Sequence, residues 1–172
     1  MKTRALLFLT ASTLVFASPV FAGQDPIPNR LIDYAGFQKI VDTSEKERES
    51  RRLTEDAFLQ MMTEKGVVVL DACSAPRYDL RHIKGAINLP FTEFAAGPLA
   101  KVIPTKDIKI LIYCNNNFLN DQVAMVSKAA TASLNLSTYT SLKSYGYDNI
   151  YELGPLLDVN KTKIPFEGSE IK

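Results

Sequence analysis

The sequence predicts an α/β fold built on an open parallel sheet, in one globular domain. Two short runs of branched apolar residues, at 67–71 and 110–113, lack the alternation of a half-exposed strand, which indicates strands buried on both faces. Segments of helical character separate the strand-like runs, and such alternation is typical of a parallel sheet. A length of 172 residues, 46% hydrophobic and 23% charged, is enough for one domain with its own core.

Residues 1–22 have the features of a secretory signal peptide. Lys2 and Arg4 form a basic start, residues 5–16 are an apolar run too short to span a bilayer, and residues 20–22 suit a cleavage site. A retained membrane anchor is the alternative interpretation. Cleavage lowers the basic count from 20 to 18 against 19 acidic residues, and this balance recruits neither nucleic acid nor an anionic membrane. We therefore predict an exported protein, periplasmic or secreted, with no nucleic-acid partner.

We expect residues 23–52 to form a linker and an extension in front of the domain, which we place at residues 53–172. Pro26 and Pro28 keep the chain extended and stop a helix from starting there. Residues 45–52 carry charges of alternating sign, which is typical of a solvated helix or connector without a partner. The sequence therefore favours an exposed face for this charged run.

The first half of the domain combines a helix with several short elements. Thr54 is a good N-cap, and the helix that it starts should stop at Gly66, just before the first buried strand. Three further elements are expected before the second buried strand, namely a helical turn, an edge or connecting strand and a short helix, at residues 76–80, 83–90 and 92–100.

The second half of the domain begins with a loosely patterned segment. Residues 118–134 predict either a helix or a loop with helical turns. Ser133 can cap a helix over 136–144, and Gly146 follows that helix as its C′ residue. Residues 149–153 then form the last strand of the predicted sheet.

Cys114 ends the second buried strand and precedes three asparagines. A thiol at the carboxyl end of a parallel strand lies where open α/β sheets bind their ligands. Asn115, Asn116 and Asn117 tolerate the left-handed conformation, so their turn can point backbone N–H groups inward as an anion-binding nest. The sequence thus indicates a nucleophile beside an anion site. The alternatives are a buried structural thiol and an ordinary polar turn.

Cysteine and histidine are scarce in this chain, which contains Cys73, Cys114 and His82. Two cysteines exclude a disulfide-rich scaffold, but they can pair or stay free in an oxidising compartment. We predict that Cys73 lies near enough to Cys114 to be its redox partner, because both follow the ends of parallel strands. The alternative for Cys73 is a buried small hydrophobe. One histidine without nearby ligands at metal spacing predicts no metal, and we expect no cofactor.

Three segments, in the right order, resemble the rhodanese-like, or sulfurtransferase, domain family. Residues 68–71, followed by Arg77-Tyr78 and then residues 82–90, are similar to the first signature, in which a strand ending in Asp leads to a His-Ile-x-Gly-Ala-x-Asn motif. Residues 110–114 are similar to the strand that leads into the family's catalytic cysteine, and residues 145–154 to its closing element.

The resemblance covers about residues 53–160 and implies an open sheet with helices on both faces, as well as an activity. It implies that Cys114 takes sulfane sulfur from a small donor, carries it as a persulfide, and passes it to a thiol or other nucleophilic acceptor. The family's active loop and first signature imply further site residues. The loop residues, expected to bind substrate, are Asn115, Asn116, Asn117, Phe118 and Leu119, and the supporting residues are Asp71, Arg77 and His82.

The active loop departs from the family pattern in two ways. Leu119 stands where the family commonly has an Arg, so the loop carries no cation, which disfavours thiosulfate as the donor. About fourteen extra residues separate Cys114 from Gly146, and such long loops are usually lids or disordered segments. The missing Arg leaves open a non-catalytic binding module of the same fold, and the presence of Cys73 leaves open a thiol redox protein that uses Cys73 and Cys114.

Overall fold

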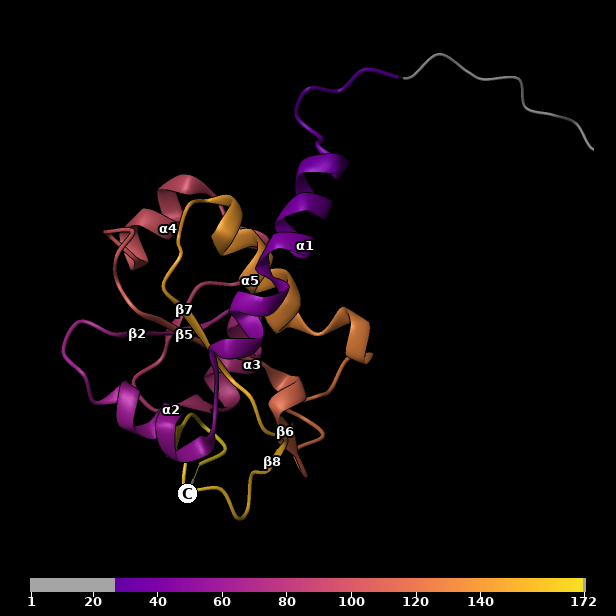
Figure 1. The fold of residues 1–172 in the computed structure, drawn as a ribbon. Helices are drawn as coiled ribbons and strands as arrows, with labels where there is room; N and C mark the ends of the chain where they lie inside the picture. The colour runs from indigo at the N-terminus through magenta and orange to yellow at the C-terminus, as the bar shows by residue number, and fades with distance from the viewer. Residues whose placement is uncertain (1–26, 172) are drawn as a thin grey trace, which may run out of the picture. The chain divides into compact units, whose positions relative to one another are not determined.

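The computed structural model describes residues 27–171 (Figure 1). The predicted signal peptide, residues 1–22, lies outside the described residues. Asp33–Lys172 form one compact unit. In the preceding unit, described from residue 27, the amide of Ile32 donates to the carbonyl of Asn29 at 3.1 Å. Within the described part of the chain, the helices are all too short or too polar to cross a membrane.

The central sheet contains five strands, all parallel, in the order β1-β7-β5-β2-β4. Strand β5 (Ile110–Tyr113) is buried at every residue and lies between β2 (Val68–Asp71) and β7 (Ile150–Leu153). The short strands β1 (Arg52–Leu53) and β4 (Ile87–Asn88) form the two edges. The predicted parallel sheet and both predicted buried strands are confirmed, because β-branched runs suit strands that are covered on both faces.

Helices cover both faces of the sheet, as the resemblance implied (Figure 1). The Thr54 side chain caps its helix by accepting the Ala57 N–H at 3.2 Å, and Gly146 leaves the last helix with a φ of 77°, as predicted. The α-helices are α1 (Tyr34–Ser50), α2 (Glu55–Met62), α3 (Ala75–Leu80), α4 (Ala96–Val102) and α5 (Leu134–Ser144).

Several shorter elements complete the fold. The 3-10 turns are η1 (Phe91–Glu93), η2 (Asn115–Asn117) and η3 (Ala130–Ala132). Two small sheets pair β3 (His82–Ile83) with β9 (Phe166–Glu167) and β6 (Phe118–Leu119) with β8 (Leu157–Asp158).

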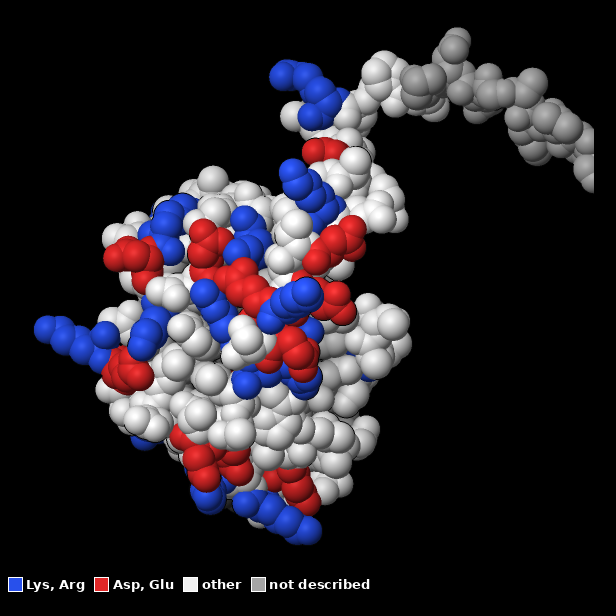
Figure 2. Space-filling model, viewed as in Figure 1, with Lys and Arg blue, Asp and Glu red and all other residues white. Residues whose placement is uncertain are grey.

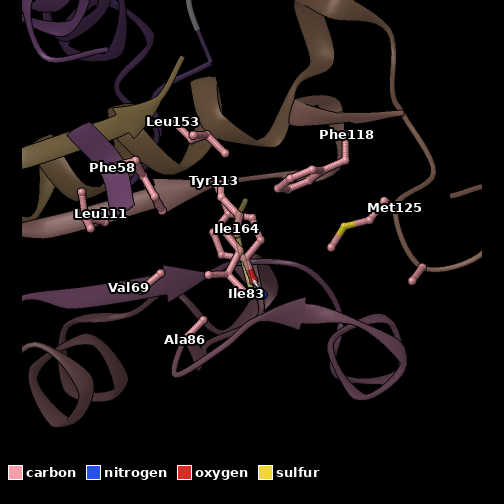
Figure 3. Packing of buried hydrophobic residues seen from close by; sticks show 11 residues of the cluster. Phe58, Val69, Ile83, Ala86, Leu111, Tyr113, Phe118, Met125, Leu153 and Ile164 are labelled. Atoms are coloured by element: carbon pink, nitrogen blue, oxygen red, sulfur yellow. Dashed lines mark hydrogen bonds between the residues drawn. The ribbon is translucent and has the colours of Figure 1, made fainter. Parts of the chain in front are cut away.

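Alternate residues of β5 point to two separate cores. Ile110 and Ile112 pack toward α4 and α5, where they contact residues such as Leu99 and Leu142. Leu111 and Tyr113 face the opposite side, together with Phe58, Phe118 and Leu153, as Figure 3 shows. The two-sided burial of one strand positions its carboxyl end, where Cys114 follows.

Two segments differ in detail from expectation. The helix expected at 92–100 is replaced by η1 and α4, because Pro98 suits only the first turn of a helix and α4 starts two residues before it. Of the two alternatives for 118–134, the structure has the loop. The Asp121 carboxylate accepts the N–H groups of Val123 and Ala124, at 3.1 and 2.8 Å, and such local bonds compete with a helix.

Much of the predicted extension is built into the domain. Strand β1 pairs with β7 at the edge of the sheet, and α1 packs against α5 (Figure 1). Residues 45–50 of the charged run therefore belong to a helix packed on the domain, and Arg52 is part of the sheet itself.

A buried polar link joins three strands beneath the site. Asp71, 2% exposed, accepts the Cys73 N–H at 2.8 Å and the hydroxyl of Tyr113. The Tyr113 oxygen in turn accepts the Ile83 N–H at 3.0 Å. Burial, reinforced by the Asp71 charge, raises the pKa of Tyr113, so the phenol stays a donor.

Replacing Tyr113→Phe should lower the free energy of unfolding by about 2–3 kcal/mol, because a buried carboxylate and a buried N–H both lose a partner. Urea unfolding measures this change. The matched control is Tyr151→Phe, which keeps its ring and should change stability by less than about 0.5 kcal/mol. A Tyr113→Phe protein as stable as the control would show that the link contributes nothing.

Candidate functional site

Cys114 follows β5 directly and is 3% exposed. The turn after it is closed by two reciprocal bonds. The Asn117 backbone N–H donates to the Cys114 carbonyl at 2.9 Å, and the Cys114 N–H donates to Asn117 Oδ1 at 3.0 Å. The thiol therefore stands at the start of a tight, internally bonded turn.

The side chain of Asn117 fixes this turn to its surroundings. Its Nδ2 donates to the carbonyls of Leu153 at 2.7 Å and Pro155 at 3.2 Å, while its Oδ1 also accepts from Asn135 Nδ2 at 3.1 Å. Asn117 thus holds the turn after β5 against the end of β7 and the first turn of α5.

The N-terminus of α5 reaches the thiol. Ser133 is the N-cap of α5, yet its side chain makes no capping bond, and its Oγ lies 3.4 Å from Cys114 Sγ. A helix N-terminus carries partial positive charge, so the start of α5 can attract an anion that binds beside Cys114. In this chain the helix approaches Cys114 after a long detour, rather than by continuing directly from the active turn.

A cavity of about 260 Å³ opens beside Cys114. Part of its wall is polar and neutral, formed by Asn116, Asn117, Ser133 and Asn135. Another part is charged and comes from three residues that sequence reasoning missed, namely Arg48, Arg52 and Glu152.

Glu152 is a buried carboxylate on β7. It is 4% exposed, and its Oε1 accepts from Arg48 Nη2 at 2.6 Å, with Arg52 Nε 3.9 Å away. Burial raises the pKa of Glu152, while Arg48 and Arg52 oppose that rise. Glu152 pairs in register with Ile112, two residues before Cys114, so Glu152 and Cys114 belong to the same face of the sheet.

The expectation of a solvated charged run at 45–52 does not hold for Arg48, whose side chain is 23% exposed and pairs with the buried Glu152. The sequence did contain a signal for this pair. A single acidic residue interrupts the otherwise apolar strand at 150–153, and a buried carboxylate requires a cation nearby.

The predicted loop residues separate in the structure. Asn116 and Asn117 line the Cys114 cavity, whereas Asn115 lines a second cavity of about 350 Å³. Phe118 is 1% exposed in the core, and Leu119 is 46% exposed on β6. Neither Phe118 nor Leu119 lines the Cys114 cavity, because the turn closes at Asn117 and the chain leaves as a strand.

The supporting residues also lie away from the Cys114 cavity. Asp71 acts on the strand end through Tyr113, and Arg77 Nη1 donates to the Val123 carbonyl at 2.6 Å, which holds the long segment after β6. His82 stacks on Tyr78 with ring centroids 3.6 Å apart, and its Nδ1 lies 2.7 Å from the Tyr78 carbonyl. Their contacts are structural.

Cys73 is a free thiol, as is Cys114, and it lines the second cavity with Arg77 and Asn115. Burial, with the Asp71 charge, raises the pKa of Cys73, so this thiol stays protonated. The pairing of Cys73 with Cys114 stays a prediction. Within residues 27–171, no three His, Cys, Asp or Glu side chains gather as a metal site would require.

Comparison with known proteins gives a family match and several distant relatives. A model of the rhodanese-like domain matches residues 54–154. A tRNA uridine(34) hydroxylase of Onion yellows phytoplasma (strain OY-M) is 30% identical over 104 residues, which are 59% of this chain and 29% of that protein. The chain thus spans less than a third of the length of this curated relative.

Among solved structures, the BH2092 protein of Bacillus halodurans is 17% identical, with a TM-score of 0.50 over 77% of this chain and 88% of that one. A structure described as rhodanese with anions from E. coli is 19% identical, with a TM-score of 0.38 over 59% of this chain and 98% of that one. At 17% identity, the first of these likenesses concerns the fold alone.

Replacing Ser133→Ala should slow the alkylation of Cys114 by iodoacetamide at pH 7 by about fivefold, the effect of losing one hydrogen bond to the thiolate. A time course of alkylation by mass spectrometry measures this rate, with Cys114→Ser protein giving the background from Cys73. Ser137→Ala, on the same helix but away from the Cys114 cavity, is the matched control. Equal rates in the two alanine variants would exclude a role for the Ser133 hydroxyl.

Proposed function

Since the chain belongs to the rhodanese-like domain family, we propose that it is a sulfurtransferase that moves sulfane sulfur through a persulfide on Cys114. The observation that carries the proposal is the environment of the thiol, which has the Ser133 hydroxyl 3.4 Å from Sγ and a cavity at its side. A hydroxyl and a helix N-terminus can both stabilise the negative charge of the donor and of the persulfide in this cavity.

The reaction proceeds in two displacements. The Cys114 thiolate attacks the sulfane sulfur of the donor, an S–S bond forms, and the donor's leaving group departs with the electron pair. A thiolate acceptor then attacks the terminal sulfur, and Cys114 leaves again as a thiolate. No external oxidant or reductant enters this cycle.

Two backbone amides are suited to hold the terminal sulfur of the persulfide. The amides of Asn117 and Phe118 donate to carbonyls inside the turn. The amides of Asn115 and Asn116 come first in the turn, where N–H groups have no acceptor within it. Of the backbone N–H groups in the predicted anion-binding nest, these two remain available to an anion.

A non-catalytic binding module is the second candidate function. The observation that favours it is the burial of Cys114, which is 3% exposed. Sulfur loading separates the two candidates, because a binding module leaves the thiol unmodified.

Intact mass spectrometry after exposure to a small sulfane donor tests the catalytic proposal. The unmodified protein should gain the mass of one sulfur atom and lose it again on addition of a thiol. Cys114→Ser should gain none while it keeps the circular-dichroism spectrum of the folded protein, and Cys73→Ser should load normally. Sulfur gain by Cys114→Ser would assign the persulfide to another residue.

We also propose that the protein is exported, on the basis of the pattern in residues 1–22. When the gene product with its own N-terminus is expressed in a bacterial host, N-terminal sequencing of the periplasmic or secreted protein should start at Gly23. Recovery of a membrane-bound protein that still starts at Met1 would favour the retained anchor instead.

A further inference from the structure

We propose that Arg48 and Arg52, which precede the residues matched by the family model, bind the anionic group of the sulfur donor in the Cys114 cavity. We further propose that Glu152 restricts this site to a group with a single negative charge. The inference rests on the proposed function, because it names the substrate class of the same site.

The cavity has cations although the active loop has none. Residues 114–119 contain no Lys or Arg. Arg48 from α1 and Arg52 from β1 both line the cavity, and their side chains are 23% and 38% exposed. Arginine is well suited to an oxyanion because its planar guanidinium presents several donors at once. The two arginines can therefore supply the positive charge that the active loop lacks because Leu119 stands in place of an Arg.

Contacts on β7 and with the residue just after it hold both guanidinium groups in place. Arg48 Nη2 lies 2.6 Å from Glu152 Oε1, and Arg52 Nη2 donates to the Gly154 carbonyl at 2.9 Å. Strand pairing sets Arg52 directly opposite Glu152. A guanidinium that is already ordered loses less entropy when it binds an anion.

Each arginine keeps donors beyond those contacts, since a guanidinium has five N–H groups. Arg48 Nε is buried and has no hydrogen-bond partner among the described residues. Arg52 gives Nη1 to the exposed carboxylate of Glu49 at 2.8 Å, a surface pair that an incoming anion can replace at little cost.

The charge of the cavity selects among anions. Its charged residues are Arg48, Arg52 and Glu152, which leave one net positive charge. Glu152 is buried, and its Oε2 has no partner within the described residues, so this carboxylate repels a second negative charge on the ligand. A monoanion neutralises the one net positive charge of the site, whereas a dianion such as thiosulfate leaves one uncompensated negative charge.

The rest of the wall fits an organic group. Leu136 and Leu156 line the same cavity as the two arginines. An organic thiosulfonate, with one negative charge and an apolar substituent, matches both the charge and this apolar surface. The Cys114 thiolate would take its terminal sulfur, and the sulfinate would leave with the electron pair toward the guanidinium groups.

The surface charge around α1 does not explain a preference for a monoanion over a dianion. Figure 2 shows Lys and Arg side chains interspersed there with Asp and Glu, without a patch of one sign. The selection must therefore come from the groups inside the cavity, where charges are screened less by salt.

The first experiment compares donors in steady-state kinetics. Wild-type protein should have a lower KM for benzenethiosulfonate than for thiosulfate. Arg52→Gln should raise the KM for benzenethiosulfonate about tenfold with a smaller change in kcat, because a charge-assisted bond to the ground-state anion is lost. Arg51→Gln is the matched control, since Arg51 pairs with Glu47 on the outside and does not line the cavity.

The second variant, Glu152→Gln, should improve the binding of the dianion instead of weakening the binding of the monoanion. Glu152→Gln removes the negative charge and should lower the KM for thiosulfate more than the KM for benzenethiosulfonate. Arg52 is more exposed than Glu152, so Arg52→Gln keeps the inference testable if Glu152→Gln does not fold. A wild-type preference for thiosulfate, or equal effects of Arg52→Gln and Arg51→Gln, would overturn the inference.

A binding measurement separates this inference from the proposed function. Benzenesulfinate, the leaving monoanion, should protect Cys114 from iodoacetamide in the wild-type protein and in Arg51→Gln, but at least several-fold less in Arg52→Gln. Protection without sulfur loading would support the anion site and contradict the sulfurtransferase. Loading without any Arg52-dependent protection would support the sulfurtransferase and overturn the anion site.

Discussion

The candidate site depends on the side-chain amide of Asn117. Its oxygen accepts the Cys114 N–H and an N–H of Asn135 from α5, and its nitrogen donates to the carbonyls of Leu153, at the end of β7, and Pro155, just after it. A buried amide with satisfied donors and acceptor is rigid, because any displacement leaves a polar group unpaired in a medium of low polarity. One side chain thus sets the position of the thiol relative to two neighbouring elements.

The long segment after the active turn brings the N-terminus of α5 back to the thiol. The chain leaves the turn as β6, passes through the Asp121 turn, and returns at Ser133 to begin α5. Arg77 fixes this long segment by donating a hydrogen bond to the Val123 carbonyl. A helix N-terminus therefore lies at Cys114 although the turn after the cysteine does not continue into that helix.

The ion pair between Arg48 and Glu152 connects the N-terminal extension to the site. A carboxylate as buried as Glu152 is costly unless a cation is near, and Arg48 offsets that cost. The ion pair ties α1 to β7, so the helix that stabilises the buried charge also brings arginine to the Cys114 cavity. Folding of the extension and completion of the site are therefore parts of one arrangement.

The sequence by itself determined the local features. Branched apolar runs identified β2 and β5, Thr54 and Gly146 marked helix ends, and the family motifs singled out Cys114, because each of these signals lies within a few neighbouring residues. The tertiary structure alone decided what surrounds the thiol. Ser133 lies 19 positions from Cys114 and Arg48 lies 104 from Glu152, and local propensity carries no information about contacts at such separations. For the same reason Phe118 and Leu119, adjacent to the turn in sequence, lie outside the cavity in space.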